Sequence, residues 1–376
     1  MRIVGFLVLW LTARVLCAGE VIKWDPRSLA LIQEGANYGR AVEVSPGRLI
    51  CAYSRGGKLE IRRSRNGGRT WEAPIPVAEW EHGHLTNAEL LPLKDGTLLF
   101  LFNRRPASAF GERKDGKIHP KEGVEQHPFS IGVTRSTNGG RTWSEPETLY
   151  EAGGEFFNGC WEPAGIQLPS GEIQVFFANE GPYRSSDEQE ISMVRSMDGG
   201  KTWSAPETIA FRAGYRDGMP VPQVLRDNSG IAVTIEDNGL DGLFKPVIVF
   251  TSAQDNWKSG AVDGRSPNRW SALAQPLPTS TYAGAPYLRQ LRNGSTVLSF
   301  QLKQEGDPSE RIAVSVGDRN ARKFGKFTHP FPETPGQDQQ WSSLCPLSDG
   351  TVLALADATI DGKRGLWCVR GKVVLE

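Results

Sequence analysis

Short apolar stretches that alternate with polar residues recur along the whole chain, and each follows a turn that contains glycine. A period of two residues is typical of β-strands, and no stretch of useful length has the period of an amphipathic helix. Each stretch also follows an earlier strand-like segment, so each predicts a β-hairpin. The six predicted hairpins centre on residues 46–53, 95–102, 170–177, 229–236, 293–300 and 349–356.

A second repeated phrase lies out of phase with these hairpins. It reads Ser-x-Asn/Asp-Gly-Gly-Arg/Lys-Thr-Trp at residues 64–71, 136–143 and 196–203, and a weaker copy occupies residues 251–257. Asn or Asp in such a phrase accepts hydrogen bonds from nearby backbone N–H groups, and Gly supplies positive φ. We interpret the phrases as scaffold turns that close an outer hairpin.

Repeated hairpins without helices predict a β-propeller, in which blades of antiparallel strands surround a central axis. Six hairpins predict six blades in a single all-β domain, residues 20–376. The segment 21–31 precedes the first hairpin. We expect it to add a strand to the last blade and close the ring, which removes exposed strand edges.

Composition narrows the possible partners. The 43 basic and 43 acidic residues give zero formal charge, which argues against nucleic acid or an anionic membrane surface. Residues 1–19 combine a basic start, a short apolar run and small residues, so they predict a signal peptide. We therefore expect a secreted or periplasmic monomer that has no membrane association after cleavage.

The cysteines and histidines suggest no cofactor or metal. The spacing of the four cysteines beyond the signal peptide fits neither a disulfide-dense scaffold nor a zinc site, so we interpret them as buried thiols. These are Cys51, Cys160, Cys345 and Cys368. His82 and His84 alternate in a predicted loop, and we interpret them as surface histidines.

Candidate chemistry lies just before and within the inner hairpins, because the innermost strands of a propeller converge on its axis. Two glutamates have unusual positions: Glu162 opens a predicted strand, and Glu236 ends an apolar run. A pair of carboxylates that flanks one bond suits glycoside hydrolysis, and nearby aromatic rings suit sugar binding. The candidate substrate-binding residues are Tyr38, Arg40, Trp161, Arg216, Asp217, Tyr287 and Trp341.

Several of these motifs resemble a known family. The repeated phrases resemble the Asp-box of sialidase-like propellers. The motifs Tyr38-x-Arg40, Trp161-Glu162-Pro163, Arg216-x-Gly218-Met219-Pro220 and the strand-ending Glu236 resemble the exo-α-1,5-L-arabinanases. The resemblance implies a six-bladed retaining hydrolase that releases arabinobiose from the non-reducing end of linear arabinan.

The same resemblance implies that Glu162 and Glu236 are the catalytic carboxylates. We favour Glu162 as acid/base and Glu236 as nucleophile, and the reverse assignment stays open. Arg40 and Arg216 would hydrogen-bond sugar hydroxyls or orient the carboxylates, and a nearby Arg216 would depress the pKa of a glutamate. The expected partner is an oligosaccharide or polysaccharide.

Two rival functions remain. A sialidase would use Arg40, Arg216 and Arg289 as a carboxylate clamp and a tyrosine nucleophile, with Tyr215, Tyr282 and Tyr287 as candidates. However, no Asp lies between Arg40 and the first box, where a sialidase needs its acid. The other rival is a carbohydrate-binding propeller without catalysis. The long charged loop 104–126 is open to two interpretations, a wall of the cleft or a plain solvated loop.

Overall fold

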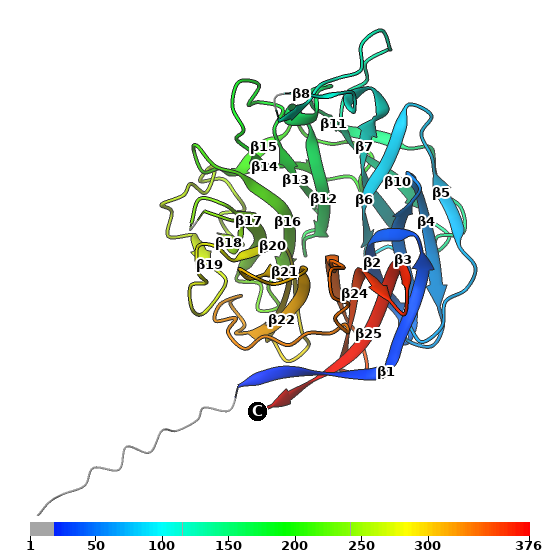
Figure 1. Ribbon diagram of the computed structural model, residues 1–376, viewed down its shortest axis with the longest axis vertical. Helices are drawn as coiled ribbons and strands as arrows, with labels where there is room; N and C mark the ends of the chain where they lie inside the picture. Colours follow the sequence, from blue (N-terminus) through cyan, green and yellow to red (C-terminus); the bar gives the residue numbers. More distant parts are fainter. Residues whose placement is uncertain (1–18, 115, 241) are drawn as a thin grey trace, which may run out of the picture.

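Six β-sheets surround a central axis in the computed structural model, which describes residues 19–114, 116–240 and 242–376 (Figure 1). The predicted all-β, six-bladed propeller is confirmed. Five blades have four strands, and the fifth has three. The predicted signal peptide, residues 1–19, lies outside the described residues except for Gly19.

The innermost strand of each blade comes first in the chain, apart from the strand that closes the last blade. The blades are, in order, β2(Ala36–Ser45) β3(Arg48–Arg55) β4(Lys58–Ser64) β5(Ile75–Ala78); β6(Gly83–Pro92) β7(Leu98–Pro106) β10(Ser130–Ser136) β11(Glu147–Glu151); β12(Cys160–Gln167) β13(Ile173–Asn179) β14(Glu190–Ser196) β15(Glu207–Ala210); β16(Asp217–Val224) β17(Gly230–Asp237) β18(Lys245–Ser252) β19(Arg269–Ser271); β20(Tyr282–Gln290) β21(Thr296–Lys303) β22(Arg311–Gly317); and β23(Gln340–Pro346) β24(Thr351–Ile360) β25(Lys363–Leu375) β1(Glu20–Glu34). Two short 3-10 helices, η1(Ala107–Ala109) and η2(Phe156–Asn158), and the small hairpin β8(Arg113–Lys114) β9(Lys117–Ile118) lie in the connections.

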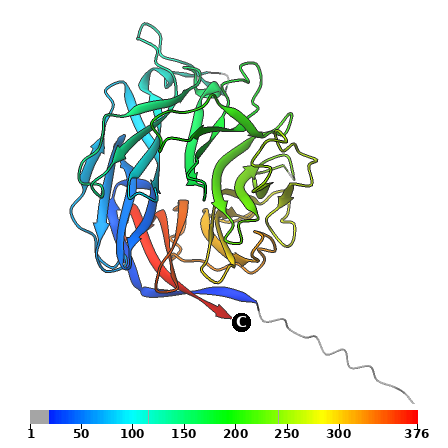
Figure 2. The ribbon, with the colours of Figure 1, turned by 180° about the vertical axis from the view of Figure 1, so that it is seen from behind.

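The N-terminal strand closes the ring. β1 pairs antiparallel with β25, from Glu20 opposite Leu375 to Glu34 opposite Gly365, and Figure 2 shows the blue strand beside the red one. The prediction that residues 21–31 complete the last blade is confirmed. Because the two ends of the chain pair with each other, the ring has no open seam.

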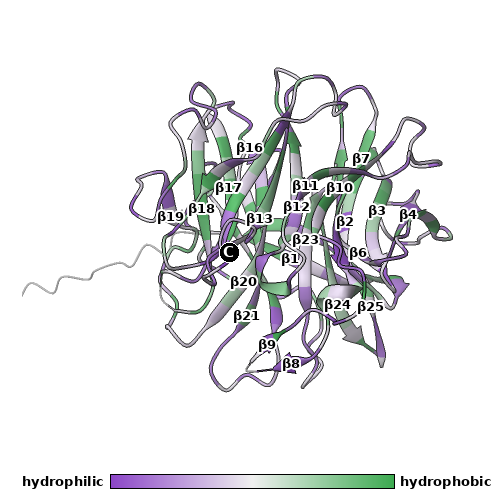
Figure 3. Cartoon of the chain, turned by 90° about the horizontal axis from the view of Figure 1, so that it is seen from above, coloured by the Kyte–Doolittle hydropathy of each residue, from purple (hydrophilic) through white to green (hydrophobic). Residues whose placement is uncertain are grey.

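Apolar side chains fill the spaces between neighbouring blades. Ile50 and Ala52 of the first blade pack with Leu90, Phe100 and Phe102 of the second, and all five are buried. Figure 3 shows apolar strands and polar loops around the ring. Removing a buried Phe from such a core typically costs about 3–5 kcal/mol, so these interfaces hold the blades in register.

The repeated phrases are turns on one face of the ring. In the first copy, Ser64 Oγ accepts a hydrogen bond from Gly68 N–H (2.9 Å), and Asn66 Oδ1 accepts one from Thr70 N–H (3.0 Å). Gly67 N–H donates to Gly47 O in the β2–β3 turn (2.9 Å). The box therefore lies at the end of the blade opposite the β3–β4 turn.

The weak fourth copy keeps the hydrogen bonds of a box with a longer spacing. Thr251 Oγ1 accepts from Trp257 N–H (3.0 Å), and Asp255 Oδ1 accepts from Ser259 N–H (3.1 Å). Asp255 comes four residues after Thr251, whereas Asn66 comes two residues after Ser64. Trp257 is buried in the core, so this turn keeps the anchoring role of the tryptophan.

The cysteines Cys51, Cys160, Cys345 and Cys368 are all buried free thiols, as the sequence predicts. Within the described part of the chain, no helix is long and apolar enough to cross a membrane. Loop 104–126 leaves β7 and carries η1 and the β8–β9 hairpin at the rim of the ring (Figure 1). Its residues 117–120 line a groove of about 310 Å³ together with Glu155, residues 157–158 and residues 184–187, so this part of the loop forms a wall at the rim.

Candidate active site

Each innermost strand has a β-bulge at an equivalent place, and a residue with positive φ lies in each of these bulges. The φ values range from 48° to 58°, and the register of every inner hairpin shifts at this point. Positive φ in a residue other than glycine carries a conformational penalty, and bulges re-aim side chains next to functional sites. The six bulge residues are Tyr38, Asn87, Glu162, Met219, Ala285 and Trp341.

The bulge residues meet at the axis. Tyr38, Met219 and Ala285, from the first, fourth and fifth blades, form one buried apolar cluster, and Trp341 of the sixth packs against it. The rings of Tyr38 and Trp341 lie 6.3 Å apart between centroids. Side chains from blades that are not neighbours therefore close the central channel.

A polar cluster lies on the same strands: Arg40, Glu89 and Tyr287 are each two residues beyond a bulge residue, and Arg289 joins them. Arg40 Nε lies 3.5 Å from Glu89 Oε2, and the Arg40 guanidinium lies 4.8 Å from the centroid of the Tyr287 ring. Tyr287 Oη donates to Glu89 Oε2 (3.5 Å), and Arg289 Nη2 lies 3.7 Å from Glu89 Oε1. Glu89 comes from the second blade and Tyr287 from the fifth, so this cluster seals the axis. Arg40 and Tyr287 are each only 2% exposed, so neither offers an accessible surface to a substrate.

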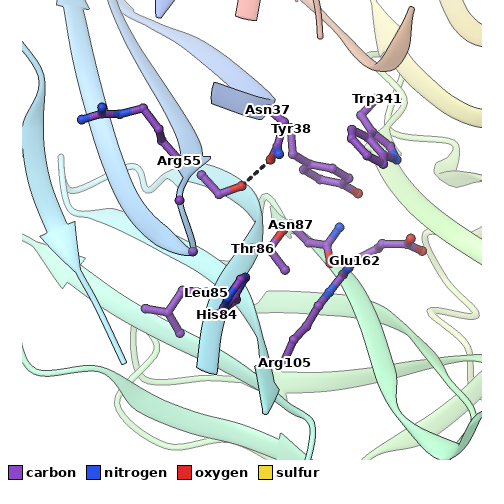
Figure 4. Close-up of a pocket in the computed structure, with 13 residues that line it drawn as sticks. Asn37, Tyr38, Arg55, His84, Leu85, Thr86, Asn87, Arg105, Glu162 and Trp341 are labelled. Carbon is purple, nitrogen blue, oxygen red and sulfur yellow. Dashed lines mark hydrogen bonds between the residues drawn. The ribbon is translucent and has the colours of Figure 1, made fainter. Parts of the chain in front are cut away.

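A cavity of about 320 Å³ lies beside this closed axis, over the first three blades (Figure 4). The β3–β4 turn forms part of its wall, so the cavity opens on the face opposite the boxes. Three predicted site residues line it: Tyr38, Glu162 and Trp341. The other lining residues are Asn37, Ser54, Arg55, Gly56, Gly57, His84, Leu85, Thr86, Asn87 and Arg105.

Glu162 is held in the cavity wall by its own bulge and by the next blade. Its Oε2 accepts a hydrogen bond from Met219 N–H (3.1 Å), and the side chain is half-buried. Burial raises the pKa of Glu162, because the charged form loses water, and the positive charge of Arg105 opposes that rise. The carboxylate is thus fixed at the boundary between the second, third and fourth blades.

Glu236 occupies a corresponding place one blade further on. Its Oε2 accepts from Ala285 N–H (2.7 Å), and the side chain is half-buried at the end of β17. Burial, and then repulsion from Glu162, raise the pKa of Glu236 to about 8. The two predicted carboxylates are therefore close enough to influence each other's protonation.

Gln301 of the fifth blade holds the position that Glu236 holds in the fourth, so it shows which contacts this position makes without a carboxylate. Glu236 pairs with Gly218 and Gln301 with Gly284, which are equivalent places just before the bulge of adjacent blades. Gln301 Oε1 accepts from Trp341 N–H (2.8 Å), as Glu236 accepts from the following blade. An amide is sufficient for this backbone contact, so the contact alone does not require a carboxylate at position 236.

Arg216 supplies positive charge near both glutamates. It forms an ion pair with the buried Glu180, and its Nη1 donates to Asp187 O (3.0 Å). Its charge acts against the rise in the pKa of Glu162 and of Glu236. Arg216 therefore lies where the sequence analysis expects it, although it does not line the cavity.

Two predicted substrate-binding residues are part of the scaffold instead. Asp217 is fully buried, and Arg269 donates to its Oδ1 (3.0 Å), so no surface of Asp217 faces the cavity. Trp161 packs against Phe129 and Phe156, with ring centroids 4.7 and 5.5 Å away. Strand alternation turns both side chains away from the axis, whereas their neighbours Glu162 and Arg216 lie close enough to Glu236 to influence its pKa.

The second blade contributes cavity residues that the sequence analysis missed. Asn87 is the bulge residue of this blade, and Arg105 Nη2 donates to Asn87 Oδ1 (2.7 Å). Alignment of the six inner hairpins would have identified Asn87, since it holds the position of Tyr38 and Glu162. No comparable sequence pattern marks Arg105, because it lies near the end of β7, after the apolar residues 98–102.

The histidines form no evident metal site. The rings of His82 and His127 stack with centroids 4.0 Å apart, and His84 is exposed in the cavity wall. Among the residues that the structure describes, no group of three or more His, Cys, Asp or Glu side chains is arranged to hold a metal ion.

Comparison with known families agrees with this repeat architecture. The BNR repeat-like domain matches residues 122–361, which is more than half of the chain. The chain belongs to the BNR repeat-like domain family. Together with the six blades, this match confirms the predicted membership of the sialidase-like propeller superfamily. No curated protein matches the sequence.

Solved structures similar to this BNR propeller include glycosidases. The α-L-arabinanase of Penicillium chrysogenum, complexed with arabinobiose, has a TM-score of 0.63 at 15% identity and covers 96% of this chain and 98% of its own. The GH93 α-L-arabinofuranosidase of Fusarium graminearum, also with arabinobiose, has a TM-score of 0.63 at 17% identity, with 93% and 97% covered. The NanB sialidase of Streptococcus pneumoniae has a TM-score of 0.58 at 16% identity, with 92% and 70% covered. At these identities the similarity shows a shared fold.

Proposed function

We propose that this BNR propeller is an exported, retaining glycoside hydrolase with a catalytic pair like that of the exo-α-1,5-L-arabinanases. The observation that carries the proposal is the pair Glu162 and Glu236. The two half-buried carboxyl groups lie on adjacent blades, each is anchored to a bulge N–H of the next blade, and each affects the other's protonation. Perturbed carboxylates beside a cavity are typical of glycosidases.

The surroundings of the two groups favour Glu236 as acid/base and Glu162 as nucleophile. Arg105 and Arg216 both favour the charged form of Glu162 against repulsion from Glu180, whereas Arg216 is the one cation among the main influences on Glu236, which Glu162 and Glu310 repel. The negative charge is therefore more stable on Glu162, and the shared proton is more stable on Glu236. This is the reverse of the assignment favoured from the sequence.

The reaction follows from that distribution of charge. Glu236 donates its proton to the glycosidic oxygen while a Glu162 oxygen attacks the anomeric carbon, so the glycosidic bond breaks and a glycosyl ester forms. The Glu236 carboxylate then accepts a proton from water. The oxygen of that water molecule attacks the anomeric carbon and breaks the ester bond. This step releases the sugar with net retention of configuration and restores the Glu162 carboxylate.

The closed axis favours attack at chain ends. Arg40, Glu89 and Tyr287 seal the channel, so a polysaccharide cannot pass through the ring. The cavity beside Glu162, about 320 Å³, is at the small end of the range for ligand pockets. A site of this shape accepts one or two terminal sugars, as an exo-acting enzyme requires.

The sialidase alternative receives less support from the geometry. Arg40 and Arg289 are both engaged with Glu89 in the sealed axis, and Arg216 is paired with Glu180. A clamp needs three guanidinium groups directed at one substrate carboxylate, and these three are already engaged with carboxylates of the chain, two with Glu89 and one with Glu180. The third possibility is a propeller that binds carbohydrate without catalysis, and a measurement of turnover distinguishes it from the hydrolase.

The first test is product analysis with purified protein, using debranched arabinan and, in parallel, a sialylated oligosaccharide. Arabinobiose with retained configuration in early NMR spectra supports the proposal. An inverted anomer, or release of sialic acid, contradicts it. Binding without turnover of any glycan in a broad panel favours the non-catalytic propeller.

The assignment of the two glutamates is tested by chemical rescue. For Glu236→Ala, added azide should restore turnover and give a glycosyl azide of retained configuration, because Glu162 still forms the ester. For Glu162→Ala, azide should replace the nucleophile and give the inverted azide. Glu34→Gln, which changes an exposed glutamate of β1, is the matched control. The opposite pattern of azides would exchange the two roles.

A further inference from the structure

The guanidinium group of Arg105 is the least compensated charge in the cavity. It reaches the cavity from β7 and lies beside Asn87 and Glu162 (Figure 4). None of the ion pairs among the described residues includes it, so no carboxylate oxygen lies within 4.0 Å of its nitrogen atoms. Burying a cation without a partner is unfavourable, which makes an unpaired arginine in a cavity wall informative.

Neutral groups fix Arg105 in place. Its Nε donates to Asn103 Oδ1 (3.1 Å), its Nη2 donates to Asn87 Oδ1 (2.7 Å), and its guanidinium lies 4.9 Å from the centroid of the Trp161 ring. These contacts orient the group without neutralising it. The Nη1 atom and the second N–H of Nη2 have no partner in the described part of the chain, and together they form the edge that accepts a carboxylate in two-point contact.

The remaining cavity wall offers donors and little negative charge. Glu162 is the single carboxylate among the described residues of the lining, and Met219 N–H already binds it. Arg55, the other arginine of the wall, is neutralised by Glu60 through two hydrogen bonds of 2.6 and 3.1 Å. Asn37 Oδ1 accepts from Ser54 Oγ (2.6 Å), which leaves the Asn37 amide nitrogen for a ligand. The wall therefore presents free N–H donors on Arg105 and Asn37 beside a single carboxylate.

We propose that the cavity beside Glu162 is a subsite for a sugar unit that carries a carboxylate, with Arg105 as its cationic partner. The volume of about 320 Å³ accommodates one such unit, and Trp341 and Tyr38 supply the aromatic side of the pocket. The proposal rests on the proposed hydrolase function only in treating the bound sugar as part of a substrate. The glycan cleaved by this protein is then acidic at the unit held next to Glu162, so efficient release of arabinobiose from neutral arabinan would count against the subsite while still supporting the hydrolase.

Binding by isothermal titration calorimetry tests the subsite without any requirement for turnover. The ligands are a methyl hexuronoside and N-acetylneuraminate, each compared with its own methyl ester, which keeps the shape and removes the charge. We expect at least one acid to bind about ten- to a hundredfold more tightly than its ester to the wild-type protein, as for a charge-assisted two-point contact. The arm that shows the difference identifies the acidic sugar.

Two variants of Arg105 assign the preference to this residue. Arg105→Gln should remove the preference for the acid over its ester. Arg105→Lys keeps the charge but cannot make the two-point contact of a guanidinium group, so it should retain only part of that preference. Arg104→Gln is the matched control, because Arg104 is the neighbouring half-buried arginine and bonds to Thr148 (2.7 Å) outside the cavity. Thermal unfolding of each variant verifies that it is folded before binding is compared.

Several results would overturn the subsite. Equal binding of acid and ester to the wild type, or no binding of either acid, excludes it. A preference that survives in folded Arg105→Gln excludes Arg105 as its cause. Should acids bind through Arg105 while no glycan is cleaved, the subsite stands and the hydrolase proposal fails, so the two conclusions are tested separately.

Discussion

Replacement of Glu236 by glutamine should stabilise the protein at alkaline pH while it abolishes turnover. The folded structure raises the pKa of Glu236 from its ordinary 4.5 to about 8. Native Glu236 therefore contributes stability below pH 4.5, and this contribution is lost as the pH rises through about 8. Glutamine lacks this dependence, and Gln301 shows that an amide can accept the same backbone hydrogen bond.

The size of the effect follows from the change in proton affinity. A rise in pKa from 4.5 to about 8 corresponds to a limit of roughly 5 kcal/mol, at about 1.4 kcal/mol for each tenfold change. The side chain is only half-buried and Arg216 lies nearby, so we expect about half of this limit, roughly 2–3 kcal/mol. For a domain of this length that is a rise of about 2–4 °C in Tm.

The assay is urea unfolding of the wild type and of Glu236→Gln at pH 5, 6.5 and 8.5. The difference in unfolding free energy should be small at pH 5 and should grow steadily toward pH 8.5. Glu34→Gln, in an exposed position, should show no such growth. If Glu236→Gln were less stable than the wild type at pH 8.5, the ionised carboxylate would be well satisfied, and the argument that Glu236 holds the proton would fail.

Three other predictions concern the scaffold around the site. Arg216→Met should destabilise the fold by about 3–5 kcal/mol in urea titrations, because it leaves Glu180 buried and unpaired, and Glu180→Gln in the same chain should recover part of the loss. Asp217→Asn should cost about 2–4 kcal/mol by the same measurement, since it weakens the buried contact with Arg269; an unchanged midpoint would mean that the contact contributes nothing. Asp198→Asn should leave the Tm at pH 7 near that of the wild type and reduce the loss of Tm below about pH 4, because hydrogen bonds from Thr202 hold the pKa of Asp198 below its ordinary range, and a steeper acid loss in the variant would contradict this.

Much of the fold could be predicted because all six blades carry an inner-hairpin turn and four of them also carry a box or a weak copy of one. The glycine turns before residues 98 and 173 mark inner hairpins, and the boxes mark outer ones, so six blades follow from counting. The pairing of residues 21–31 with the last blade could also be inferred, since a ring must close. The longer spacing in the fourth box could not, because the bonding of Thr251 with Trp257 depends on the folded turn.

The candidate site was predictable only where chemistry coincided with an unusual strand position. Glu162 and Glu236 could be singled out as candidates because a carboxylate near the end of a strand is unusual. Asp217 was misplaced in the sequence analysis, since a one-residue step along a strand reverses the side-chain direction and places it against Arg269. Arg105 was missed because its interest lies in having no carboxylate within ion-pair distance among the described residues, and this can be recognised only in the folded structure.

The six bulges also bear on how such a protein changes over evolution. Each blade presents a single side chain at the same place near the axis, on the same left-handed backbone, and the six found here are all different. A point mutation at any one of them alters one sector of the site, while the hydrogen-bonded ladder on either side of the bulge keeps its register. New specificities can therefore arise one blade at a time, and libraries randomised at the five bulge positions other than Glu162 are a compact way to search for them.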